Sequence, residues 1–245
     1  MITVCIPAYN EEKQIRAAAL AVLQAAEETG VSLIEVIIVN DGSSDGTAGE
    51  IARLEKEFPS VHSISHPQNK GLGASFIDAI QAAKYGKICL FPGDNTISLY
   101  TIKNVLKNRD KADIVIGYYN NNELRSLGRH AMSIIFNLIY CSTFNVHARY
   151  LQGSPCLPTE RVRTLDLVAT EYSLLAEIQI KLMRSGASFI EVDGYFNPGY
   201  DRKSVALRRK TVINTLYAYF RLVYEVFIRH PLRYRHKPVR VLPPP

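Results

Sequence analysis

The sequence lacks internal repeats and low-complexity segments. Its most apolar C-terminal stretch, 211–220, is too short to cross a bilayer, which needs about 20 nearly uninterrupted apolar residues. Cysteine is scarce: Cys5, Cys89, Cys141 and Cys156 lie far apart and form no metal-type pairs, so we expect reduced thiols in or near the core. The amino end has neither a basic segment nor a long apolar run, which argues against a cleaved secretion signal. These absences predict a folded globular protein in the cytoplasm.

Two common nucleotide-binding signatures are also missing. The segment Gly71-Leu72-Gly73 lacks the third glycine of a dinucleotide-binding turn, because Phe76 stands at that position, and it would follow the third strand instead of the first. No Gly-Lys-Ser/Thr loop of the Walker type occurs. Dinucleotide-dependent oxidoreductases and P-loop nucleotide triphosphatases therefore lose support.

Acidic residues are almost missing from the last part of the chain. From Arg202 to the C-terminus there are eleven lysines and arginines and one acid, Glu225, which leaves 18 basic and 22 acidic residues elsewhere. A strongly basic tail on a slightly acidic body predicts an anionic partner, such as a lipid surface, an anionic substrate or nucleic acid. We expect no nucleic acid, because no module of aromatic and basic residues precedes the tail.

The segment 205–228 is predicted to form an amphipathic helix. Lys210, Asn214, Arg221 and Glu225 fall near one stripe of that helix, and its remaining surface is apolar and aromatic. A helix of this kind with basic flanks suits the surface of a membrane. A helix packed against the domain core, or in the interface of a homo-oligomer, explains the pattern equally well.

Apolar runs alternate with helical patterns through the first half of the sequence. The runs predict strands at 2–6, 33–39, 61–64, 87–91 and 112–116, and the segments between them predict helices at 15–26, around 51–54, 76–83 and 99–107. This order predicts an α/β fold with a doubly wound, mostly parallel sheet. Further along we expect a helix at 125–141, a polar connection at 144–159, a helix at 172–183 and a strand at 189–192.

Asp94 follows a proline-glycine turn after the predicted strand 87–91. In an open α/β sheet, ligands bind just beyond the carboxyl ends of the strands. A carboxylate there can hold a divalent cation, because Mg²⁺ in phosphate chemistry is bound by one or two carboxylates together with the substrate's phosphate oxygens. The alternative is that Asp94 caps the helix that begins near Ser98.

Four polar segments each close a successive predicted strand, at 6–12, 39–47, 69–74 and 92–95. In this order and spacing they resemble the inverting glycosyltransferases of family 2, and within that family the polyprenyl-phosphate (dolichol-phosphate mannose type) sugar synthases. The resemblance is close from residue 1 to about residue 120 and loose over 125–204. It implies the nucleotide-diphospho-sugar transferase (GT-A) type of α/β fold.

The resemblance also implies a division of the chain and a reaction. The transferase domain would occupy 1–204, with a nucleotide-sugar-binding half (1–117) and an acceptor half (118–204), followed by the basic amphipathic tail (205–245). A hexose would pass with inversion from a UDP- or GDP-sugar, assisted by Mg²⁺ or Mn²⁺, to a polyprenyl phosphate at the cytoplasmic face of a membrane. The alternatives are a soluble transferase acting on a saccharide or other hydroxyl acceptor, and a catalytically inactive protein that binds nucleotide sugars.

Donor contacts are assigned by the same resemblance. Tyr9 would stack on the base, Glu11 would accept hydrogen bonds from the ribose, and Asp41 would hydrogen-bond the base. The matching donor positions are Pro7, Ala8, Tyr9, Glu11, Asp41, Lys70 and Gly71. Ordinary turn and capping roles are the alternative for these residues.

The metal position departs from the family pattern. Asp94 matches the last residue of the family's Asp-x-Asp motif, but Pro92 takes the place of the first. The donor's diphosphate would then have to complete the shell of the cation. Arg149 stands where relatives often have a base Asp; an ionised phosphate acceptor needs no general base, and Arg149 would bind it. Glu171 and Glu177 are other candidates for a base, with a helix-surface position as the alternative.

The segment 199–204 resembles the family's basic Arg-x-x-Gly-x-Ser loop, with Gly199 where Arg is usual and Arg202 where Gly is usual. Arg202 and Lys203 would neutralise the leaving diphosphate and, with Asp94, form the catalytic set. A solvated turn is the alternative.

Overall fold

A mostly parallel sheet forms the centre of the protein. The computed structural model describes residues 1–121, 127–167, 169, 173–198 and 209–242. Within these residues the strands follow the order β3-β2-β1-β4-β6-β5-β7-β8. Neighbouring strands are parallel except at β6, which is antiparallel to both β4 and β5. The strand bounds are β1 Ile2–Ala8, β2 Ile34–Asn40, β3 Val61–Ser65, β4 Lys87–Leu90, β5 Ile114–Tyr119, β6 Pro155–Pro158, β7 Ser188–Gly194 and β8 Val239–Arg240.

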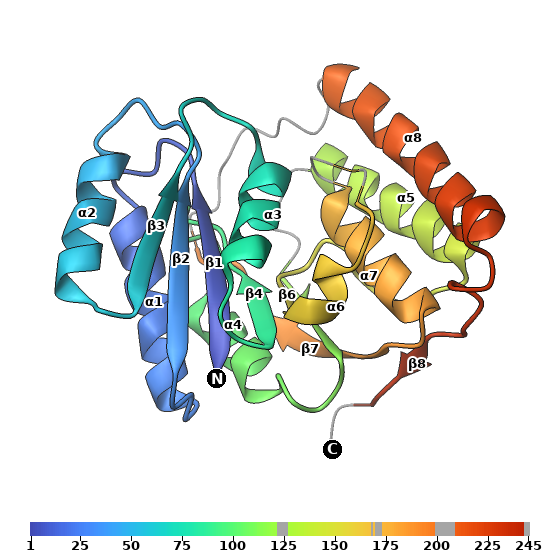
Figure 1. The fold of residues 1–245 in the computed structure, drawn as a ribbon, viewed down its shortest axis with the longest axis horizontal. Coiled ribbons are helices and arrows are strands. Elements are labelled where there is room, and N and C mark those ends of the chain that lie inside the picture. The colour runs from blue at the N-terminus through green and yellow to red at the C-terminus, as the bar shows by residue number, and fades with distance from the viewer. Residues whose placement is uncertain (122–126, 168, 170–172, 199–208, 243–245) are drawn as a thin grey trace.

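Helices cover both faces of the sheet. Their bounds are α1 Ile15–Glu28, α2 Thr47–Glu57, α3 Leu72–Ala82, α4 Leu99–Lys107, α5 Leu127–Phe144, α6 Thr159–Arg163, α7 Leu174–Arg184 and α8 Arg209–Tyr224, which continues into the π-helical turn η2 Glu225–Arg229. Helices α1, α2 and α4 pack on one face, and α3, α6 and α7 pack on the other. Helices α5 and α8 lie beside α7 (Figure 1).

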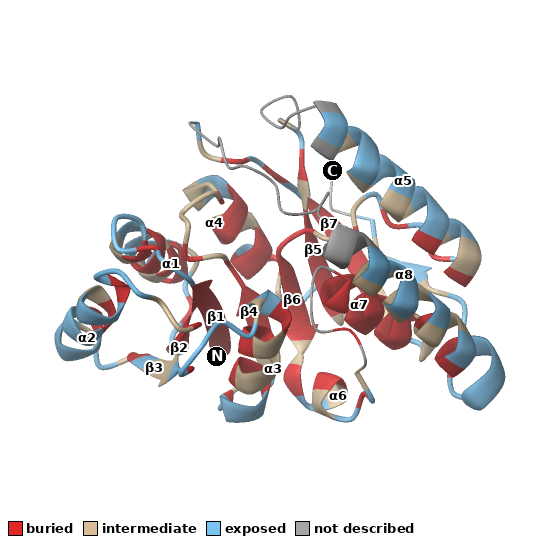
Figure 2. Cartoon of the chain, turned by 90° about the horizontal axis from the view of Figure 1, so that it is seen from above, coloured by how far each residue is buried: buried red, intermediate tan, exposed pale blue. Residues whose placement is uncertain are grey.

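The central strands are buried from both sides, as Figure 2 shows. Every residue of β1 is buried, which explains why the strand is apolar apart from Thr3 and shows no polar alternation. All four cysteines are free thiols; three are buried and Cys141 is half-buried, as predicted. Burial raises the pKa of the Cys5 thiol.

The predicted doubly wound, mostly parallel α/β sheet is confirmed, and each predicted strand overlaps an observed one. The main difference lies in the predicted polar connection 144–159. It contains β6, and α6 begins where it ends. The structure also adds β8 from the basic tail, which pairs with β7. The tail therefore completes one edge of the sheet.

Candidate functional site

The site is built at the point where the strand order reverses. β1 and β4 are neighbours, but the chain continues from β1 to β2 on one side and from β4 to β5 on the other. Such a reversal leaves a crevice beyond the carboxyl ends of the two strands. The Gly93 N–H donates to the Pro7 carbonyl oxygen over 3.0 Å, so the turn after β4 lies directly against the end of β1.

The absence of a side chain at Gly93 favours this close approach. A Cβ there would lie 3.0 Å from the Pro7 oxygen and 3.0 Å from Ile15 Cδ1. The turn that carries Asp94 is therefore packed directly against the sheet. Its Oδ1 accepts a hydrogen bond from the Thr96 hydroxyl at 2.7 Å and one from the Thr96 N–H at 3.1 Å.

The loops after β1 and β2 are joined to each other. The Asn10 N–H donates to Ser43 Oγ at 3.0 Å, and the Glu11 N–H donates to Thr47 Oγ1 at 2.8 Å. Tyr9 is 46% exposed at the mouth of this pair of loops, whereas Glu11 is buried. An exposed ring at this edge is accessible for stacking on a planar ligand.

Asp45 stabilises the second of these loops. Burial alone would raise the pKa of Asp45, but hydrogen bonds from the Thr47 hydroxyl and N–H and from the Glu12 N–H outweigh it, and the pKa is lowered overall. The carboxylate therefore stays charged and keeps the loop in one conformation.

Asp41 ties the end of β2 to the segment that follows β3. Its Oδ1 accepts from the Lys70 N–H and its Oδ2 accepts from the Gly71 N–H, each over 2.8 Å. The side chain is buried, and His66 Nδ1 lies 2.7 Å from the same Oδ1. Asp41 thus fixes the backbone of Lys70 and Gly71, and these contacts were not foreseen from the sequence.

The segment after β7 reaches the Asp94 turn. The Asn197 N–H donates to the Thr96 carbonyl oxygen at 2.9 Å, and Asn197 Nδ2 donates to the Asn95 carbonyl oxygen at 2.7 Å. Phe196 and Ile97 form an isolated antiparallel bridge. The last described residues before the predicted basic loop therefore lie beside the Asp94 turn.

Arg149 belongs to the same edge. Because β6 runs opposite to β4 and β5, the loop that precedes it lies at the carboxyl ends of the parallel strands. Arg149 is exposed, its guanidinium lies 5.5 Å from the ring centroid of Tyr118, and its N–H donates to Glu191 Oε1. Burial raises the pKa of Glu191, and hydrogen bonds from the Arg149 N–H together with the nearby Arg240 guanidinium only partly offset this effect.

The predicted donor and metal residues gather at this edge, each at or just beyond the end of a neighbouring strand. They are Pro7, Ala8, Tyr9 and Glu11 after or within β1, Asp41 after β2, Lys70 and Gly71 before α3, and Asp94 after β4. Arg202, Lys203 and Glu171 lie outside the described residues. Their predicted roles, and the ligand contacts of the other residues, stay predictions.

Glu177 lies in a different environment from the helix surface considered above. It is 3% exposed, its Oε2 accepts from the Ala169 N–H at 2.7 Å, and its Oε1 lies 2.6 Å from Lys181 Nζ. The ion pair lies within α7, and the hydrogen bonds from the Ala169 N–H to Glu177 and from Lys181 Nζ to the Asp166 carbonyl oxygen connect α7 to the chain before it. A carboxylate held in this way is structural and does not point to a role as a base.

The donor set for a cation is small. No group of three or more His, Cys, Asp or Glu side chains able to hold a metal occurs in the part of the chain that the structure describes. Asp94 supplies a carboxylate at the crevice, which fits a cation that takes most of its ligands from a bound diphosphate and water.

Sequence comparison agrees with this arrangement. The family model described as glycosyl transferase family 2 matches residues 3–164. The chain therefore belongs to glycosyl transferase family 2, as predicted.

Individual relatives are more distant. The chain is 29% identical over 154 residues to a dolichyl-phosphate beta-glucosyltransferase of Trichomonas vaginalis, covering 55% of this chain and 47% of that protein. It is 27% identical over 139 residues to an undecaprenyl-phosphate 4-deoxy-4-formamido-L-arabinose transferase of Salmonella paratyphi B, covering 56% of this chain and 42% of that protein. The chain thus spans less than half the length of these curated relatives.

Solved structures share the fold. Glucosyl-3-phosphoglycerate synthase of Mycobacterium tuberculosis, in complex with Mn²⁺, uridine diphosphate and phosphoglyceric acid, gives a TM-score of 0.64 at 16% identity over 89% of this chain and 78% of that chain. The same protein has been solved with Mg²⁺ and uridine diphosphate. The similarity confirms the GT-A type of fold.

Proposed function

We propose that the chain transfers a hexose, with inversion, from a nucleotide diphosphate sugar to a polyprenyl phosphate at a membrane surface. The observation that carries the proposal is the convergence of all four predicted donor segments on one edge of the sheet, at the switch point between β1 and β4. The relatives named for dolichyl phosphate and undecaprenyl phosphate support this choice of acceptor.

Donor binding would use the exposed ring of Tyr9 and the backbone of Lys70 and Gly71 that Asp41 holds in place. Asp94 would hold Mg²⁺ or Mn²⁺ together with the donor's phosphate oxygens. When bound, the cation neutralises charge on the leaving diphosphate. The structural neighbour crystallised with these ions and uridine diphosphate supports both assignments.

The acceptor would approach from the Arg149 side. An ionised phosphate attacks without losing a proton, so the missing base Asp at this position does not prevent transfer. The exposed guanidinium of Arg149 can pair with the phosphate by charge-assisted hydrogen bonds.

Helices α5 and α8 support a membrane location for the acceptor. They contact each other through the hydroxyls of Thr143 and Tyr219, 2.7 Å apart. Both helices contain exposed residues (Figure 2), and large apolar side chains are among them. The large hydrophobic side chains that are 45–65% exposed are Ile134, Ile135, Leu138 and Ile139 on α5 and Ile213, Leu216, Tyr217, Phe220 and Tyr224 on α8. Exposed Arg233, Arg235 and Lys237 follow in the tail and complement an anionic lipid surface. None of the helices described here is both long and apolar enough to cross a bilayer.

A donor screen followed by a phase assay tests the proposal. Thermal shift with UDP-, GDP- and dTDP-sugars, with and without Mn²⁺, identifies the donor, and radiolabelled sugar from that donor should then enter the organic phase with polyprenyl phosphate. Asp94→Asn should abolish cation-dependent turnover, whereas Asp110→Asn, at a carboxylate 75% exposed after α4, should leave it unchanged. Label transferred only to a water-soluble product, separated from the unreacted donor, would assign a hydroxyl acceptor instead.

Vesicle flotation tests the membrane part. A Leu138→Glu/Phe220→Glu variant should lose binding to vesicles that contain phosphatidylglycerol, because each change places a charge among the exposed apolar side chains. Leu20→Glu on α1, where the leucine is 37% exposed, is the matched control and should float like the wild type. Equal flotation of both variants would contradict the role of α5 and α8.

A second candidate is a protein that binds nucleotide sugars without transferring them. Pro92 in place of the first carboxylate favours it. Tight donor binding without label transfer to any acceptor, in the presence of Mn²⁺, would select this candidate.

A further inference from the structure

His66 is a buried side chain for which the proposed function has no role so far. It follows β3 directly, and its N–H extends the strand pairing by donating to the Asn40 carbonyl oxygen at 2.9 Å. Its ring is 3% exposed and lies between two carboxylates. Nδ1 is 2.7 Å from Asp41 Oδ1, and Nε2 is 2.8 Å from Asp78 Oδ2.

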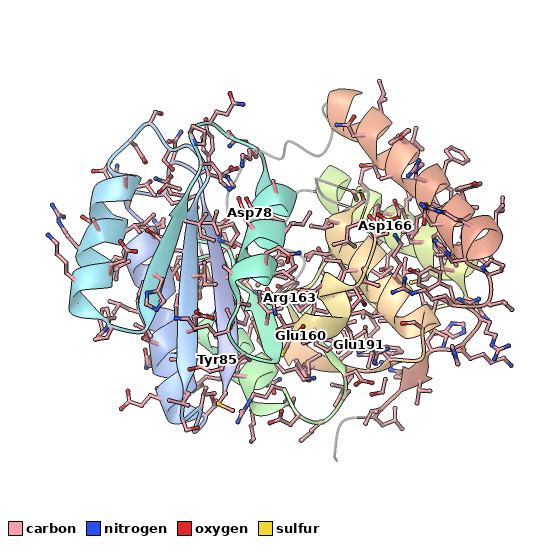
Figure 3. All side chains as sticks on the ribbon, viewed as in Figure 1. Asp78, Tyr85, Glu160, Arg163, Asp166 and Glu191 are labelled. Carbon is pink, nitrogen blue, oxygen red and sulfur yellow. The ribbon has the colours of Figure 1, made fainter. Side chains whose placement is uncertain are left out.

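Each ring nitrogen thus lies within hydrogen-bonding distance of one carboxylate, so the ring bridges Asp41 and Asp78. Asp78, which Figure 3 shows on α3, also lies 3.9 Å from Lys70 Nζ. His66, Asp41, Asp78 and Lys70 thus form one cluster that joins the end of β2, the segment after β3 and α3.

The segment between His66 and α3 depends on this cluster for its position. Asp41 receives the N–H groups of Lys70 and Gly71, and Gly71 adopts φ +91°, a conformation that side chains disfavour. Gly42 packs against the same segment from the other side, because a Cβ there would lie 2.5 Å from the Gln68 carbonyl carbon. The segment is therefore packed between the end of β2 and α3.

We propose that His66 is a positioning residue for donor binding. Its ring forms a clamp that joins Asp41 to Asp78, and through Asp41 it holds the Lys70 and Gly71 backbone in the geometry that receives the nucleotide. The inference rests on the proposed function, and it adds a determinant of donor affinity that makes no contact with the reacting atoms. Because Asp41 is oriented by the clamp, a loss of His66 acts on donor affinity and leaves the chemistry at Asp94 in place.

Two readouts test the clamp in the full chain. In the ligand-free protein, His66→Ala should speed hydrogen exchange at the Lys70 and Gly71 amides by roughly tenfold, because the carboxylate that accepts from them is no longer held. With the donor found in the screen, His66→Ala should raise the donor KM by roughly tenfold and change kcat by less than about twofold. His66→Asn keeps a hydrogen-bond donor near the position of Nδ1, so both readouts should return most of the way to the wild-type values.

Two further variants control for folding. His62→Ala removes an exposed histidine from β3, the strand that His66 follows, and should match the wild type in both readouts. Asp78→Ala removes the other end of the clamp at a side chain that is 42% exposed, so it should fold even if His66→Ala does not, and it should shift both readouts in the same direction.

The outcomes separate the clamp from the proposed function. Unchanged amide exchange in His66→Ala and Asp78→Ala overturns the clamp. Faster exchange with an unchanged donor KM overturns its role in donor binding. A wild type that binds none of the nucleotide sugars overturns the proposed function itself, which is visible without any variant, and removes the donor role of His66 with it.

Discussion

Gly42 and Gly30 offer a matched pair of substitutions that measures how tightly the donor segment is held. Both residues have positive φ, +71° and +66°, so alanine at either position meets the same backbone strain of about 1 kcal/mol. A Cβ at Gly30 has no heavy atom within 4 Å, whereas a Cβ at Gly42 would lie 2.5 Å from the Gln68 carbonyl carbon and 2.7 Å from the Asn69 nitrogen. Only Gly42→Ala therefore forces the segment after β3 to move.

The expected magnitudes differ accordingly. Gly30→Ala should cost about 1 kcal/mol of unfolding free energy, and Gly42→Ala should cost about 2–4 kcal/mol, because overpacking adds about 1–3 kcal/mol to the strain. In a chain of this length each kcal/mol lowers Tm by roughly 2–4 °C. We expect a decrease of roughly 2–4 °C for Gly30→Ala and roughly 4–16 °C for Gly42→Ala, measured by thermal unfolding followed by circular dichroism.

Donor binding provides the second measurement for this pair. Gly42→Ala should raise the donor KM, since the displaced segment carries Lys70 and Gly71, and Gly30→Ala should leave the donor KM unchanged. Equal losses of Tm in the two variants, with equal donor KM values, would refute the argument that the segment is packed rigidly against β2.

Three other predictions concern the rest of the fold. Lys181→Met should cost about 3–5 kcal/mol in urea unfolding, because it removes the cation that balances the buried carboxylate of Glu177. Adding Glu177→Gln should restore most of the loss, and additive losses would contradict the pairing. Burial alone would raise the pKa of Asp113, but hydrogen bonds from the N–H and hydroxyl of Ser188 outweigh it, and the pKa is lowered below 3.8. The stabilisation by this carboxylate is present above pH 3.8 and is lost as the pH falls through the folded-state pKa. The Tm of Asp113→Asn should therefore fall less steeply below pH 4 than the Tm of the wild type. Gly153→Ala should lose more than about 4 kcal/mol and yield insoluble protein, because its Cβ would lie 1.9 Å from a carbonyl oxygen of β5; soluble protein with an unchanged Tm would contradict that contact.

The sequence predicts the central strands well, because strands buried on both faces must be continuous apolar runs. β6 cannot be predicted in this way, because it is short and its pairing partners lie far away in the sequence. It has four residues, and prolines occupy both of its ends, positions 155 and 158. Its pairing with β4 and β5 depends on segments about 40 to 70 residues away, and no local pattern encodes it.

The site was only partly predictable for a similar reason. Residues directly after a strand, such as Tyr9, Asp41 and Asp94, can be assigned to the carboxyl edge once the strands are known. His66 and Asn197 cannot, since their partners lie elsewhere along the chain: His66 reaches acids 25 and 12 residues away, and Asn197 reaches a carbonyl 102 residues away. A single buried histidine carries no periodic signal that would distinguish it from an exposed one.

The reversed direction of β6 has a consequence for how the two substrates are accommodated. In an all-parallel sheet, the chain would enter a strand between β4 and β5 from the amino edge. Because β6 is antiparallel, the loop that precedes it, 145–154, lies at the carboxyl edge instead. Insertions or exchanges in that loop would reshape the entrance opposite the Asp94 turn without altering any residue of β1, β2 or β4. Under the proposed function, we therefore expect changes in this loop to alter acceptor preference and to leave donor binding unchanged.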